Sequence, residues 1–316
     1  MLLLREQLRR SIGSGEHAIS IGVFDGVHGG HQLLIGRMCE EARARHLTPA
    51  ILTFHPSPVK VLRPDVPFLY LDSLEQRVEH LRALAVEEVA VVDFTSELAQ
   101  VAAADFMAVL VEEAGLRLLV VGEDFALGRG REGNIARLTE IGAAQGFEVI
   151  GLPLMAAADD RISSTRVRRA LAEGDMELVT ELLARPFALR GPVLHGDARG
   201  RTIGFPTLNI GVAADRALPP DGIYVTRARL DNGHEYLAAT NIGVRPTFEG
   251  AHDRRVETYL LDFEGDLYGQ VVTIELLRRL RPELKFDGID ALVAQMAGDV
   301  EATRAYFAAQ PPQARL

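Results

Sequence analysis

Strand-like and helix-like segments alternate from residue 18 to about residue 150, and this alternation restricts the fold more than any other feature. Strands joined through helices form a parallel sheet that those helices cover. Ligands of such sheets bind in the loops that follow the carboxyl ends of the strands. The expected strands are Ala18–Phe24, Pro49–Phe54, Val89–Asp93, Leu116–Gly122 and FEVIG at 147–151, with helices over Gly30–Leu47, after the capping pair Ser73 and Gln76, and near Asp105–Ala114.

The pattern changes after Arg185-Pro186. Gly222–Leu230 alternates apolar and polar side chains as a half-buried strand does, and Asp231-Asn232-Gly233 then predicts a hairpin turn. Val256–Phe263 and Gln270–Leu280 are further expected strands, and 287–308 has helical spacing. We therefore expect two domains, 1–185 and 186–316, of which the second is a small antiparallel barrel or sandwich.

Composition narrows the classes of partner. A formal charge of −10 argues against a nucleic-acid or anionic-membrane partner. The apolar run in MLLLREQLRR is too short for a signal peptide or a membrane span, so a soluble cytoplasmic protein is expected.

The lone cysteine, Cys39, excludes an internal disulfide and a thiolate metal cluster. Neither lysine, Lys60 or Lys285, belongs to a GxxxxGK[ST] phosphate loop, so bound phosphate must be held by another device.

The stretch GVFDGVHGGH at 22–31 predicts such a device. An apolar strand leads into a glycine-rich turn, where a helix begins near Gly29-Gly30 with free N–H groups that favour an anion. His28 and His31 are three positions apart and can project toward the same side. Gly22 and Gly26, with the glycine pair, let a phosphate approach the backbone.

A second phosphate motif is ISSTRVRR at 162–169. It places hydroxyl groups at a helix start and arginines one turn later, which suits a departing pyrophosphate. The alternative is that Ser164 or Thr165 only caps the helix, which explains the hydroxyls but not the arginines.

Together with TFHPSP at 53–58 and VGEDFALGRGREGN at 121–134, these motifs resemble the adenylyltransferase module of bacterial bifunctional FAD synthetases. The HxGH element is similar to the signature of the nucleotidyltransferase superfamily. The resemblance implies a Rossmann-like α/β nucleotidyltransferase domain in which the FMN phosphate attacks the α-phosphorus of ATP. It assigns Gly22, Phe24, Asp25, Gly26, His28 and His31 to ATP, Ser164, Thr165 and Arg168 to its β- and γ-phosphates, and Phe54, Pro56, Pro58, Asp124 and Phe125 to the flavin side.

The second half carries its own candidates. In GRTIGFPTLN at 200–209, Thr207 and Asn209 offer two neutral oxygens on one strand face, which suits Mg²⁺ bridging phosphates. Glu257 shares a row with the side chains at 259, 261 and 263, which is otherwise apolar and is expected to face the core. A carboxylate on such a row has a raised pKa and suits proton abstraction from an alcohol. The alternative is a glutamate at a strand end that reaches solvent.

GRTIGFPTLN, PPDGIY, NIGVRPTF, VETYLLDFEGDLYG and LRPELKF occur in the order found in riboflavin kinases, which this half resembles. The resemblance implies a six-stranded barrel followed by a C-terminal helix beside the flavin. It makes Glu257 the base that activates the riboflavin 5′-hydroxyl and assigns Mg–ATP to Gly200, Arg201, Gly204, Phe205 and Pro206, with Thr207 and Asn209 on Mg²⁺.

The two resemblances predict a bifunctional enzyme that phosphorylates riboflavin to FMN and adenylylates FMN to FAD, with release of pyrophosphate and with Mg²⁺ in both steps. Ser57 stands where the family often has histidine and Ala126 where it often has arginine. A first alternative is therefore an enzyme with a working kinase half only, and a second is a flavin-binding regulator without activity. The sequence leaves the oligomeric state open.

Overall fold

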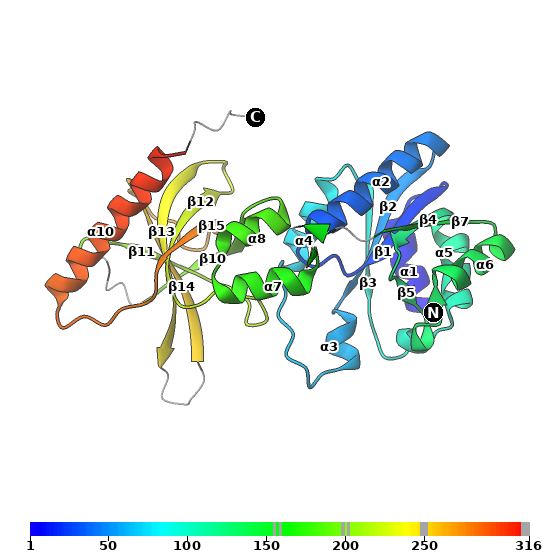
Figure 1. The fold of residues 1–316 in the computed structure, drawn as a ribbon, viewed down its shortest axis with the longest axis horizontal. Coiled ribbons are helices and arrows are strands. Elements are labelled where there is room, and N and C mark those ends of the chain that lie inside the picture. The colour runs from blue at the N-terminus through cyan, green and yellow to red at the C-terminus, as the bar shows by residue number, and fades with distance from the viewer. Residues whose placement is uncertain (154–155, 158–159, 197–199, 201–202, 247–251, 311–316) are drawn as a thin grey trace. The chain divides into compact units, whose positions relative to one another are not determined.

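The computed structural model describes residues 1–316 apart from 154–155, 158–159, 197–199, 201–202, 247–251 and 311–316. Backbone packing divides the chain into two compact units, Met1–Ser164 and Thr165–Leu316 (Figure 1). Helices α7 (Ser164–Glu173) and α8 (Met176–Leu183) thus group with the second unit apart from Ser164. The boundary between the two modules at residue 185 stays a prediction. No helix in the described part of the chain is long and apolar enough to cross a membrane.

The first unit is built on a five-stranded sheet in the order β3-β2-β1-β4-β7, and all four pairings are parallel. This confirms the predicted α/β architecture. The strands are β1 (His17–Gly22), β2 (Thr48–His55), β3 (Glu88–Asp93), β4 (Leu116–Gly122) and β7 (Glu148–Leu152). Because β1 lies at the centre, the loops that follow β1, β2 and β4 end at one edge of the sheet.

Helices cover both faces of this sheet, and each face has its own apolar core. Ile19 and Ile21 of β1 pack in a cluster with residues of α1, α5 and α6, whereas Ala18 packs in the opposite cluster with residues of α2 and α4. Successive strand residues point to opposite faces, which explains the division. The helices are α1 (Leu2–Ser11), α2 (Gly29–Arg45), α3 (Pro58–Leu62), α4 (Leu74–Arg82), α5 (Ala103–Ala114) and α6 (Ile135–Gln145).

The second unit is a closed six-stranded barrel in the order β10-β11-β14-β13-β12-β15, with antiparallel pairings, as the resemblance implied. Its strands are β10 (Phe187–Leu194), β11 (Thr207–Ile210), β12 (Gly222–Leu230), β13 (Glu235–Pro246), β14 (His252–Leu260) and β15 (Val271–Arg281). The C-terminal helix α10 (Ile289–Ala308) packs against β13 and β12.

Inside the barrel, three fully buried threonines link neighbouring strands. The hydroxyl oxygens of Thr226 and Thr240 are 2.8 Å apart, and those of Thr240 and Thr258 are 2.9 Å apart. The buried row of β14 is therefore Val256, Thr258 and Leu260. The prediction that Glu257 lies on the core-facing row is wrong, because a shift of one residue along a strand exchanges its two faces and the segment VETYLL is apolar enough for either register.

Candidate active sites

The first unit holds two adjoining cavities at the carboxyl ends of its parallel strands. The smaller, of about 200 Å³, is lined by predicted nucleotide residues that include Gly22, Phe24, His28 and His31. The larger, of about 680 Å³, lies beside it. Gly22, Asp124 and Phe125 line both cavities, so a ligand in one can meet a ligand in the other.

The two histidines form a stacked pair. Their ring centroids are 3.6 Å apart with an interplanar angle of 17°. His28 is the N-cap of α2, and its Nδ1 accepts a hydrogen bond from the His31 backbone N–H at 3.3 Å. A Cβ at Gly30 would lie 3.3 Å from the His28 ring, so a glycine at this position leaves room for the ring. The helix start thus fixes the pair at the cavity wall.

Burial, together with the charges of His28, Arg77 and Arg161, holds the pKa of His31 well below its usual range. The edge of the Phe24 ring meets the His31 ring, with 5.1 Å between centroids. His31 is therefore a neutral imidazole in the free protein at neutral pH, and His31 Nδ1 has no hydrogen-bond partner among the described residues. A neutral ring can gain a proton when an anion arrives.

Asp25 shapes the loop and does not line the cavity. Its buried carboxylate accepts hydrogen bonds from the backbone N–H groups of Leu71, at 3.0 Å, and Asp72, at 3.3 Å. Its carbonyl oxygen accepts a hydrogen bond of 2.8 Å from the Ser164 hydroxyl. Gly26 (φ +83°) gives the same loop its left-handed turn. Asp25, Gly26 and Ser164, which the resemblance assigns to ATP, are therefore not among the residues that line this cavity.

Thr165 and Arg168 lie on the first two turns of α7, in the second unit. Their assignment to the β- and γ-phosphates stays a prediction. Arg161 and Ser163, which the sequence reasoning did not assign, line the histidine cavity directly. Ser163 is the second residue of the motif ISSTRVRR and Arg161 directly precedes it, so the motif was the signal that could have indicated both.

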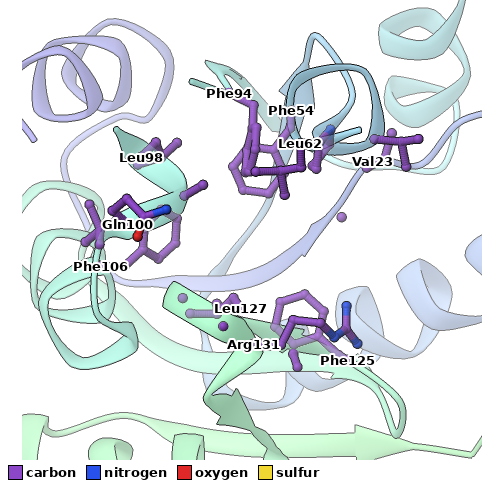
Figure 2. A pocket seen from close by; sticks show the side chains of 18 of the residues that line it. Val23, Phe54, Leu62, Phe94, Leu98, Gln100, Phe106, Phe125, Leu127 and Arg131 are labelled. Atoms are coloured by element: carbon purple, nitrogen blue, oxygen red, sulfur yellow. The ribbon is translucent and has the colours of Figure 1, made fainter. Parts of the chain in front are cut away.

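The larger cavity has aromatic and aliphatic walls (Figure 2). Four of the five predicted flavin residues line it, namely Phe54, Pro58, Asp124 and Phe125. Pro56 lies in the loop directly after β2 and is not among the lining residues. The sequence reasoning missed other lining residues, which include Val23, Leu62, Phe94, Leu98, Gln100, Phe106, Leu127 and Arg131.

One of the missed residues, Phe94, could have been predicted from its position in the sequence. Phe94 directly follows β3 and therefore lies at the same sheet edge as Phe54, which is next to the end of β2. The two rings meet edge to face, with 5.4 Å between centroids. At the border between the cavities, the Asp124 carboxylate accepts a hydrogen bond from Arg161 at 2.6 Å, and its carbonyl oxygen accepts one from Arg131 at 3.2 Å.

The second unit also holds two adjoining cavities. One, of about 300 Å³, lies between the outer face of the barrel and the C-terminal segment. Glu257 is half-buried and lines this cavity, and its register partners on the two neighbouring strands are Asn209 and Asn241. The residues of this wall that sequence reasoning did not assign include Asn241, Tyr259, Arg281, Glu283, Phe286, Leu292, Met296 and Asp299.

The other cavity, of about 340 Å³, is lined by Pro206, Thr207, Leu208 and the 263–268 loop. Thr207 lines both cavities of this unit. The predicted glycine loop packs tightly, because a Cβ at Gly200 would lie 2.2 Å from the Phe205 carbonyl oxygen. Gly200 and Phe205 line the cavity of Glu257, whereas Gly204 (φ +85°) forms a turn and Arg201 lies outside the described residues.

The donors around Thr207 fit a cation only together with a ligand. Among the described residues, no group of three or more His, Cys, Asp and Glu side chains could hold a metal ion. The hydroxyl of Thr207 and the amide oxygen of Asn209 are the hard oxygen donors that Mg²⁺ prefers, and Mg²⁺ commonly completes its shell with water and substrate phosphates. The residues present therefore fit Mg²⁺ delivered with a nucleotide.

Comparisons with known proteins match each half of the chain separately. Residues 13–166 match the family model described as FAD synthetase, and residues 183–307 match the one described as riboflavin kinase. The bifunctional riboflavin kinase/FMN adenylyltransferase of Listeria monocytogenes is 39% identical over 293 residues, which cover 92% of both chains. The protein of that name from Escherichia coli (strain K12) is 37% identical over 296 residues, which cover 93% of this chain and 94% of the relative.

Among solved structures, a crystal structure described as a macrolide-efflux protein from Streptococcus pneumoniae matches with a TM-score of 0.85 at 34% identity. The match covers 94% of this chain and 96% of that one. The likeness therefore extends over both units in sequence and in fold.

Proposed function

The chain belongs to the family of bifunctional riboflavin kinases/FMN adenylyltransferases, and from this premise we propose how its two units divide the two reactions. The enzyme phosphorylates riboflavin to FMN and adenylylates FMN to FAD, with ATP as co-substrate in both steps. The second unit performs the phosphorylation and the first unit the adenylylation. Because both steps consume ATP, we place the enzyme in the cytoplasm.

In the adenylylation, an oxygen of the FMN phosphate attacks the α-phosphorus of ATP, and the bond to the β-phosphate breaks to release pyrophosphate. No protein nucleophile is needed, so catalysis consists of positioning and charge stabilisation. The isoalloxazine ring occupies the aromatic cavity of 680 Å³ and the triphosphate the cavity of His28 and His31. The two histidines stabilise the charge that develops on the phosphoryl oxygens.

In the phosphorylation, Glu257 accepts the proton of the riboflavin 5′-hydroxyl while that oxygen attacks the γ-phosphorus of ATP. The bond between the γ-phosphorus and the bridging oxygen breaks, and ADP leaves. Support comes from the placement of Glu257 at the wall of the 300 Å³ cavity, next to Thr207, which also lines the adjoining cavity. Mg²⁺, when bound through Thr207 and Asn209, would supply positive charge to the phosphates of ATP.

The observation that carries this proposal is that each unit holds a pair of cavities with a shared wall. Each pair can hold a flavin and a nucleotide side by side, as a transfer between them requires. A regulator that only binds flavin needs one cavity.

The test is chromatography of products after incubation with riboflavin, ATP and Mg²⁺, and the expected product is FAD. His28→Ala is expected to accumulate FMN, with adenylylation slowed about 100-fold or more. Glu257→Gln is expected to slow FMN formation about 100-fold or more and still to convert added FMN to FAD. The controls are His234→Ala and Glu301→Gln, which change exposed side chains.

FMN as the only product of the unaltered protein would favour the alternative of a working kinase half alone. Absence of both products would favour a flavin-binding regulator. Equal loss of both activities in either variant would contradict the division between the units.

A further inference from the structure

One fully buried side chain of the first unit carries a charge that the mechanism above does not use. Arg77 of α4 is 0% exposed. Its Nη1 donates hydrogen bonds of 3.0 Å to two carbonyl oxygens, those of Val23 and Phe54. Val23 directly follows β1, and Phe54 is the next-to-last residue of β2. A single nitrogen thus joins the ends of the two strands whose loops build the active site.

The surroundings of Arg77 extend this connection to the next loop. Its guanidinium lies over the Tyr70 ring, 5.5 Å from the centroid. The Tyr70 hydroxyl accepts a hydrogen bond of 2.8 Å from the Ser57 backbone N–H, in the loop after β2. The Thr53 hydroxyl donates to the Val23 carbonyl oxygen at 2.9 Å, which ties the same two strands a second time.

Stability alone does not explain this charge. Nε and Nη2 of Arg77 have no hydrogen-bond partner among the described residues. Burying a charge whose N–H groups are only partly satisfied is costly, and well-packed apolar side chains often replace buried charges without loss of stability. A costly buried group at the base of an active site points to a functional reason.

Arg77 holds two residues in the wall of the aromatic cavity, and the residue before Val23 lines both cavities. Val23 and Phe54 line the aromatic cavity, and Gly22 lines both cavities. The histidine pair follows on the loop that begins at Val23. A shift of the Val23 carbonyl relative to that of Phe54 would move the two histidines relative to the aromatic cavity.

We propose that Arg77 is a positioning residue for adenylyl transfer, which sets the distance between the histidine pair and the flavin cavity by binding the carbonyl oxygens of Val23 and Phe54. The proposal rests on the assignment of adenylylation to the first unit. Arg77 has a second effect on the same site, because its charge contributes to holding the pKa of His31 below the usual range. Both effects require the guanidinium or another cation at this position.

The test compares Arg77→Met with Arg77→Lys in the full chain and measures both reactions of each variant. Arg77→Met is expected to slow the conversion of FMN to FAD about 100-fold, as displacements of about 1 Å do, and to leave the conversion of riboflavin to FMN within about twofold. Arg77→Lys keeps a cation and is expected to stay within about tenfold of the unaltered enzyme. The kinase reaction in the same chain serves as an internal control for enzyme concentration and for the folding of the second unit.

Arg216→Met is the matched control in the second unit. Arg216 is also buried, donates to the Ala188 carbonyl oxygen at 3.1 Å and lies 5.9 Å from the centroid of the Phe187 ring. Its replacement is expected to leave the conversion of FMN to FAD unchanged. An equal loss of that reaction in this control would mean that any buried arginine matters in the same way.

NMR titration of the His31 ring separates positioning from general damage. The pKa of His31 is expected to rise in Arg77→Met and to stay near its original value in Arg77→Lys. Normal adenylylation in Arg77→Met would overturn the proposal. So would an equal loss in both variants with an unmoved His31 titration. If Arg77→Met does not fold, Arg77→Lys decides between the same outcomes, and failure of the unaltered enzyme to form FAD would refute the proposed function instead.

Discussion

His31 shows how a single residue can respond to the substrate. The free protein holds its pKa low through burial, the neighbouring His28 ring and two arginines. A phosphate charge at about 4 Å contributes roughly 4 kcal/mol in the opposite direction at an effective dielectric constant of about 20. The helix start opposes protonation by only about 0.3–1 kcal/mol. The phosphate effect exceeds that of the helix start and opposes the effects of burial and of the neighbouring positive charges, so we expect one imidazole of the pair to take up a proton when ATP binds.

We therefore expect the pKa of His28 or His31 to rise on ATP binding. A ligand that raises a pKa binds more tightly at lower pH, so the Kd for ATP at the first unit should increase as pH rises through the interval between the free and bound values. NMR titration of the labelled histidines with and without ATP measures this directly. An ATP complex in which neither ring titrates higher than in the free protein contradicts the expectation.

Residues whose placement depends on local geometry could be predicted from the sequence. The histidine pair is such a case, because a spacing of three at a helix start brings two rings together. Glu257 and Asp25 are not. The face of Glu257 depends on the pairing of β14 with β11 and β13, and the carboxylate of Asp25 is bound by Leu71 and Asp72, far away in the sequence. Arg77 was missed for the same reason, since helical periodicity does not show which carbonyl oxygens a long side chain reaches.

At the scale of elements, the C-terminal helix is held to the barrel by a largely buried ion pair. Arg281, the last residue of β15, donates two hydrogen bonds to the Asp299 carboxylate of α10, at 2.9 and 2.7 Å. Gln295 donates to the same carboxylate at 3.1 Å. Both members of the pair line the cavity of Glu257, where we place the riboflavin 5′-hydroxyl, so this contact also fixes one wall of the site.

Asp299→Asn is expected to loosen α10 at this wall, because removal of one member of a buried pair leaves the other charge uncompensated, at a cost of about 3–5 kcal/mol. If about 1.4 kcal/mol of this cost weakens the binding of riboflavin, the KM for riboflavin rises about tenfold. The conversion of FMN to FAD should not change. Steady-state kinetics of the two separate reactions measures both.

The control lies on the same helix. Arg304 forms an exposed bidentate pair with Asp262, and exposed pairs contribute only about 0–1 kcal/mol. Arg304→Gln should therefore leave the KM for riboflavin nearly unchanged. A similar KM increase in both variants would show that any link between α10 and the barrel has the same effect.

At the scale of the whole molecule, the type of sheet in each unit followed from the sequence much better than the cavities did. Alternation with helices predicted the parallel sheet, and two-residue alternation with an Asn-Gly turn predicted the antiparallel half. The cavities combine residues from segments far apart in the sequence, such as Phe54, Phe94 and Phe125. Spacing along the chain therefore does not predict that these residues lie close together.

Each unit contains its own pair of cavities. FMN is the product of the second unit and the substrate of the first. We expect FMN to leave the second unit and to bind the first unit from solution. In a mixture of labelled riboflavin, ATP, Mg²⁺ and a large pool of unlabelled FMN, the first FAD formed should then carry little label, and the labelled fraction should grow as labelled FMN enters the pool. His28→Ala serves as the control, because it should fill the FMN pool with label and form almost no FAD. Early FAD with the full specific activity of the riboflavin would mean that FMN passes between the sites without mixing.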